Sequence, residues 1–148
     1  MDRHTLTRRE EAGWAEFRSA LDNLLPGQRE TLAVNDDGWT ARDLVWHVRY
    51  WWEHLTGMLE EMREGTFREP ESDDALTDAQ NAAVLVRARG KSFAESERGA
   101  DEARSRMLEA WASLPEVDEA AARWFLWETI EHYEEHLAGL RAAGEVSA

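Results

Sequence analysis

The stretch TARDLVWHVRYWWEHLTGMLEEMREG, residues 40–65, decides the fold of this chain. Its apolar residues recur at spacings of three and four, which is the pattern of an α-helix with one buried face. Thr40 is a typical N-cap, with Asp43 as a capping-box-like partner, and Gly65 is a typical helix end. The stretch therefore predicts a helix over residues 41–64. The expected buried stripe consists of Leu44, Val48, Trp51, Leu55, Met58 and Met62.

Helical periodicity continues through most of the remaining sequence, and strand signals are nearly absent. A first helix is expected over residues 7–25, where Pro26-Gly27 stops it. A third is expected over residues 77–89, and a helix restarts at the capping-box pattern SFAE and runs to Leu114. A last helix is expected over residues 117–143. The sequence thus predicts an all-α protein, a four-helix bundle formed by residues 1–148 as a single domain.

The charge of the chain limits its partners. A formal net charge of −14 argues against binding of nucleic acid and against an anionic membrane surface, because both require clustered Lys and Arg. The chain has no cysteine, so disulfides and thiolate metal sites are excluded. No apolar run reaches the ~20 residues of a membrane span, and the N-terminal residues lack the apolar core of a signal peptide. We expect a cytoplasmic protein, with a homodimer left open and residues 65–76 as a candidate lid.

The histidines form the strongest candidate site. His132 and His136 are four residues apart, so they project from one side of the last helix. His47 follows Leu44 by three residues and precedes Trp51 by four, which is expected to place it on the buried side of the second helix. Three neutral imidazoles converging in a bundle could bind zinc, nickel, iron or copper and leave one position open. The alternative is a hydrogen-bonded polar cluster in the core. His54 is expected outside the metal-binding set, because a fourth imidazole would close the open position.

Two stretches carry a resemblance to a known family. GWTARDLVWHVRYWWEHL, with Trp39, Thr40, Asp43 and His47, resembles the start of the second helix of DinB-like proteins. ETIEHYEEHL, residues 128–137, resembles the closing motif of the ClbS/DfsB branch of that superfamily. The resemblance covers the chain from about residue 39 to residue 140. It implies an antiparallel four-helix bundle of the DinB/YfiT type. It also implies a three-histidine metal site made of His47, His132 and His136.

The resemblance also implies a class of function. Relatives in this superfamily include isomerases and transferases that use low-molecular-weight thiols, and the ClbS branch includes a protein that disarms a reactive genotoxin. We therefore expect a metal-dependent enzyme, with zinc or nickel bound, that detoxifies a small electrophile by thiol transfer or hydrolysis. The alternative is a protein that binds and sequesters a toxin without catalysis. Glu128 and Tyr133 are the candidate catalytic residues, and Trp51 and Tyr133 the candidate pocket residues, with ordinary core packing as the alternative for both aromatics.

Overall fold

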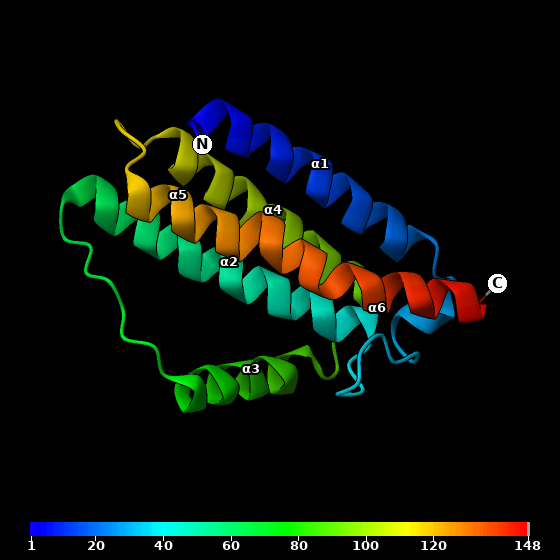
Figure 1. The fold of residues 1–148 in the computed structure, drawn as a ribbon. Helices are drawn as coiled ribbons and strands as arrows, with labels where there is room; N and C mark the ends of the chain where they lie inside the picture. Colours follow the sequence, from blue (N-terminus) through cyan, green and yellow to red (C-terminus); the bar gives the residue numbers. More distant parts are fainter. Residues whose placement is uncertain (148) are drawn as a thin grey trace. The chain divides into compact units, whose positions relative to one another are not determined.

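The computed structural model describes residues 1–147 of the chain, and their side chains as far as residue 145 (Figure 1). These residues form helices and connecting loops and contain no strand, which confirms the all-α prediction and is compatible with a helical bundle. The elements are α1 (Arg3–Asp22), the 3₁₀ turn η1 (Pro26–Arg29), α2 (Ala41–Glu64), α3 (Asp74–Ala88), α4 (Phe93–Ala112), α5 (Glu119–Leu126), the π-helical segment η2 (Trp127–Glu131) and α6 (His132–Ser147). Within this range, none of the helices has the length and apolar character that crossing a membrane requires.

The chain divides into two compact units. The first consists of residues 1–42 together with the chain from residue 116 onward, and the second consists of residues 43–115. In the first unit, α1 packs against the last helix through a group of aromatic rings. The ring centroids of Trp14 and Phe17 lie 5.6 Å and 5.9 Å from that of Tyr133. These three rings, with buried Leu6 and Leu21, fix α1 to α6.

The last helix is continuous from α5 through η2 to α6, because the residues that join these elements keep right-handed helical backbone angles. Residues 127–131 follow the wider π pattern, in which each N–H reaches back five residues instead of four. Such a segment adds about one residue to a helix and rotates everything that follows it. The predicted single helix over residues 117–143 is therefore confirmed as one helix, but its second half has a shifted register.

The connector between η1 and α2 lies directly against α6. An ideal Cβ on Gly139 would overlap the carbonyl oxygen of Val34, so only glycine allows this approach. The connector is held in its own turn by a 2.7 Å hydrogen bond from the Val34 N–H to the Trp39 carbonyl. A second bond of 3.0 Å runs from the Trp39 N–H to the side chain of Asn35. These contacts fix Trp39 beside α6.

In the second unit, α2 has the predicted bounds, but two members of its predicted buried stripe, Trp51 and Met62, are only half-buried. Trp52 is completely buried, whereas Trp51 is only half-buried. The buried residues recur at spacings of three and four through Trp52, so Trp51 lies beside the buried stripe. There its indole N–H donates a 2.9 Å hydrogen bond to the side chain of Asn81 on α3. The next indole therefore provides the apolar core contact on α2, and Trp51 attaches α3 to α2 through a polar contact.

The start of α4 follows the predicted capping box. The Ser92 hydroxyl accepts a 3.1 Å hydrogen bond from the Glu95 N–H, and the helix begins at Phe93. Two other helices begin earlier than predicted because aspartates cap them: Asp2 accepts from the Thr5 N–H, and Asp73 accepts from the Leu76 N–H. Hydrogen bonds of this kind satisfy backbone donors that would otherwise be left at a helix start.

Candidate metal centre

His132 and His136 form a close pair at the start of α6, directly after the π-helical segment. Their ring centroids are 4.9 Å apart and their planes are inclined by 62°. The four-residue spacing stacks the two side chains on one side of the helix, as the sequence predicts. π-Helical segments are frequent at functional sites, and this one sets the direction in which the pair projects.

Both imidazoles of this pair are held in the neutral form. Burial lowers the pKa of His132 to about 3, with a further lowering from His136, while a hydrogen bond with the Glu128 backbone opposes the shift. Burial also lowers the pKa of His136, against the opposing charge of Glu135. Neutral imidazole is the form that binds metal ions. At neutral pH the pair therefore offers nitrogen lone pairs without having to lose protons.

Trp39 covers one face of this pair. Its ring stacks on that of His136, with centroids 6.4 Å apart and an angle of 28° between the planes. The connector that carries Trp39 is fixed against α6 at Gly139, one turn beyond His136. From the sequence, Trp39 was expected only as part of a family motif, and its position beside a histidine was not predicted. The available signal was the position of this bulky indole in a turn-forming segment. It directly follows a glycine and lies three residues after Asp36.

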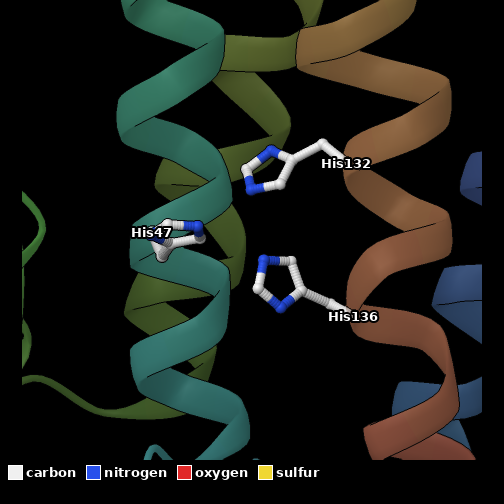
Figure 2. A group of neighbouring side chains, drawn as sticks. All are labelled: His47, His132 and His136. Carbon is white, nitrogen blue, oxygen red and sulfur yellow. The ribbon is translucent and has the colours of Figure 1, made fainter. Parts of the chain in front are cut away.

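His47 projects from α2 and is 6% exposed, so the prediction that it lies on the buried side of its helix is confirmed. His47, His132 and His136 each offer one ring nitrogen, and these three atoms lie within 4.8 Å of one another. Figure 2 shows the three rings turned toward one another. The described residues thus contain a three-histidine group that could hold a metal ion.

Glu128 lies in the π-helical segment, one turn before His132. Burial, together with the charge of Glu135, raises the pKa of Glu128 to about 8. Its Oε2 atom is buried and has no hydrogen-bond partner among the residues that the structure describes. The carboxyl group is therefore protonated at neutral pH, which is unusual for a glutamate and common for residues that transfer protons.

The two other predicted site residues lie in separate surroundings. The Tyr133 hydroxyl donates a 2.8 Å hydrogen bond to the carboxylate of Glu10, and both residues are almost fully buried. Tyr133 also lines a pocket of about 200 Å³ between α1 and the last helix, with Gly13 and Ile130 among its neighbours. Trp51 contacts the rings of Tyr50 and His54 and bonds to Asn81 of α3. Their roles in binding or catalysis stay predictions.

Glu10 was missed by the sequence analysis, although a signal was present. It lies in the segment RREEAG, where charged residues suggest a solvated face. Its spacing of four from Leu6 and seven from Phe17, however, puts it on the buried stripe of α1. A buried carboxylate must be hydrogen-bonded, and Tyr133 is one of its partners.

His54 is the one histidine of α2 that does not belong to the three-histidine group. It lines a groove of about 330 Å³ in the second unit together with Glu61 and with Phe67 of the loop after α2. Burial lowers the pKa of His54, and the charge of Glu61 opposes that shift. The loop after α2, which lies within the predicted lid of residues 65–76, forms one wall of this groove, and its role as a lid stays a prediction.

Comparison with known proteins gives no relative for this chain. No protein-family model, no curated protein and no solved structure matches it. The three-histidine group and its surroundings are therefore the observations from which its function has to be argued.

Proposed function

We propose that His47, His132 and His136 bind one divalent transition ion, with zinc or nickel as the expected metal. The observation that carries this proposal is the set of three imidazole nitrogens within 4.8 Å of one another. Ligand atoms around one zinc ion are roughly 3–3.5 Å apart, since zinc–nitrogen bonds are about 2.0–2.1 Å long. Binding would have to bring these nitrogens closer by at most about 1–2 Å.

The chemistry of the donors supports the proposal. The pKa of His132, about 3, and the lowered pKa of His136 leave both rings neutral at physiological pH. Nitrogen donors of this kind suit zinc, nickel and copper better than magnesium or calcium.

The proposed activity is the conversion of a small electrophile by hydrolysis or by transfer to a low-molecular-weight thiol. A three-histidine ion would supply an open coordination position that lowers the pKa of a water or a thiol. Glu128 holds a proton at neutral pH, since its pKa is raised to about 8, and can give that proton to a leaving group. Trp39, stacked on His136, provides an apolar wall that keeps bulk water from one side of the pair.

The proposal includes the fold type and the family. An antiparallel four-helix bundle of the DinB/YfiT type would bring α2 and the last helix together, which is the arrangement that the ClbS/DfsB-like motifs imply. The all-helical architecture and the histidine group are in keeping with this assignment. The assignment itself rests on the motifs at residues 38–55 and 128–137.

Sequestration without catalysis is the second candidate. It is favoured by the aromatic character of the surroundings, since Trp39 and His136 form a flat stacked pair that could hold a planar apolar molecule. In this version the histidines act as hydrogen-bond partners for the bound molecule. The two candidates differ in their need for metal and in turnover.

Metal content tests the proposal first. Protein purified without chelator, or loaded with zinc or nickel and dialysed, should contain one ion per chain by elemental analysis. His132→Ala should lose stoichiometric binding, because two imidazoles hold such an ion poorly against water and buffer. His54→Ala is the matched control, since it removes a half-buried histidine from α2 without touching the group. A wild-type protein that takes up neither metal would contradict the proposed site.

Turnover separates the two candidates. Metal-loaded protein should consume a simple epoxide or an activated alkyl halide, with or without added thiol, at catalytic ratios. Glu128→Gln should reduce the rate by 10²-fold or more while leaving the metal bound, because a general acid contributes about 10²–10⁴-fold. Sequestration would be favoured if the protein protected the electrophile stoichiometrically without turnover and if Glu128→Gln left this protection unchanged.

A further inference from the structure

Helix α3 has apolar residues on two opposite faces. Val84 and Ala88 are buried, and Leu85 is half-buried on the same side. On the opposite side, about half a turn away at 100° per residue, stand exposed Leu76, Ala79, Ala83 and Val86, referred to below as the outer stripe. Leu76 and Val86 are 55% and 64% exposed. A helix that is apolar on both sides is normally covered on both sides.

The direction of the outer stripe is fixed by the anchoring of α3. The Trp51 indole N–H donates a 2.9 Å hydrogen bond to Asn81, at the centre of the buried face. Asp73 caps the start of the helix by accepting from the Leu76 N–H. These contacts hold the buried face against α2, so the outer stripe is presented outward within its unit.

The charges on α3 are separated along its length. Its beginning carries Asp73, Asp74 and Asp78, and its end carries Arg87 and Arg89. A second α3 running in the opposite direction would bring acidic beginnings against basic ends at both sides of the contact. Antiparallel alignment also places opposite helix dipoles side by side. The helix is therefore electrostatically complementary to an inverted copy of itself.

We propose that a second copy of this chain docks on the outer stripe, with the two α3 helices antiparallel about a two-fold axis near residue 81. This register pairs Leu76 with Val86 of the partner subunit and Ala79 with Ala83 of the partner subunit. It also brings the acidic start of one helix near the basic end of the other, where Arg87 flanks the stripe. Small residues in the middle of the stripe let the two helices approach closely. Each contact occurs twice, as a two-fold interface requires.

The area of this contact sets the strength of the dimer. One pair of helices of 15 residues each buries less than the ~1,200 Å² of a standard stable interface. The dimer should therefore be weak and concentration-dependent, with Kd on the order of 10–100 µM. The proposal is independent of the metal site, since none of the three histidines lies on α3.

Sedimentation velocity of the full chain between about 5 and 500 µM tests the proposal, with the weight-average mass expected to rise toward twice the monomer mass. Leu76→Glu should weaken association by ~10-fold or more. Leu25→Glu is the matched control, because Leu25 is equally exposed, at 57%, but lies outside α3. A chain that stays monomeric throughout, or equal weakening by both variants, would overturn the proposal.

Charge substitution at Arg87 tests the antiparallel direction and leaves the apolar contacts intact. Arg87→Ala should weaken the dimer and Arg87→Glu should weaken it several-fold, because an antiparallel partner presents its acidic helix start there. Parallel helices would set Arg87 against its own copy, so Arg87→Ala would then strengthen association and the proposed orientation would be wrong.

Crosslinking tests the register. Because the chain has no cysteine, introduced thiols are unique. A mixture of Ala79→Cys and Ala83→Cys proteins should form the mixed disulfide faster than either protein forms its own. Equal rates in all three samples would contradict the register, and association of the wild-type chain only with another protein would contradict self-docking.

Discussion

The carbonyl oxygen of Val34 occupies the space into which a side chain at Gly139 would project. This contact ties the connector before α2 to the helix that carries His132 and His136. Because the same connector presents Trp39 to the His136 ring, a glycine, which has no side chain, controls the surroundings of a proposed metal ligand.

Gly139→Ala should displace the connector and separate Trp39 from His136. The added methyl group meets backbone, which cannot rotate away, so we expect a loss of roughly 1–3 kcal/mol in the free energy of unfolding. Chemical denaturation measures the loss, and Trp emission with and without zinc reports the displacement.

Gly144→Ala on the same helix is the control. Its Cβ would lie 3.8 Å from Asn23, an ordinary contact, so it should stabilise the protein by about 0.5–1 kcal/mol. Equal effects of the two substitutions would contradict the assigned role of Gly139.

Tyr133→Phe should destabilise the protein by roughly 1–3 kcal/mol, because it removes a hydrogen-bond donor from the buried carboxylate of Glu10. Denaturation of the variant beside Tyr50→Phe, which changes the other tyrosine of the chain, measures this cost. Metal content should stay at the wild-type value. If turnover fell 100-fold while stability stayed unchanged, Tyr133 would be a proton donor and its bond to Glu10 would be secondary.

The stability of metal-free protein should depend on pH through Glu128. Its pKa is raised from 4.5 to about 8 in the folded state, so between these values the folded chain binds more protons than the unfolded chain. The contribution of this group to stability is therefore lost as pH rises from about 4.5 through 8. Glu128→Gln should remove the loss, and the variant should exceed wild type by on the order of a few kcal/mol at pH 9. An unchanged difference between pH 5 and pH 9 would contradict the raised pKa.

Metal retention should extend to lower pH than ordinary histidines allow. An imidazole pKa of ~6.5 would predict release below about pH 6. The pKa of His132, about 3, and the lowered pKa of His136 mean that these rings do not gain protons there while the protein is folded. Unfolded histidines do gain protons below 6.5, so stability falls as pH falls below that value. We expect zinc release to coincide with unfolding. Parallel circular dichroism and a zinc-sensitive dye test this, and release near pH 6.5 with helicity intact would contradict it.

Much of the helical pattern could be predicted because its signals are local. The bounds of α2 and the start of α4 at Ser92 depend on capping residues and glycine, which act within one turn. The three-histidine group was also accessible, because a four-residue spacing fixes the His132–His136 pair and a seven-residue apolar repeat places His47. These features need no knowledge of distant residues.

Features that depend on a distant partner could not be predicted in this way. The Trp51 indole bonds to the Asn81 side chain, 30 residues away in the sequence, and the spacing on α2 alone does not reveal that partner. The stacking of Trp39 on His136 requires the connector to fold back onto α6. Helix α1 begins earlier than predicted because Asp2 caps it. The prediction relied on the spacing of apolar residues, which does not include Asp2.

The π-helical segment at Trp127–Glu131 has a consequence for sequence change in this chain. Substitutions there would leave the helix register intact, but a deletion of one residue would turn the segment into ordinary α-helix and rotate α6 by about 100° relative to α5. The two histidines would then point in a different direction while keeping their spacing of four. A variant with one residue deleted in this segment would thus retain the HxxxH motif and lose the site, so the motif alone is not a sufficient marker of function among such chains.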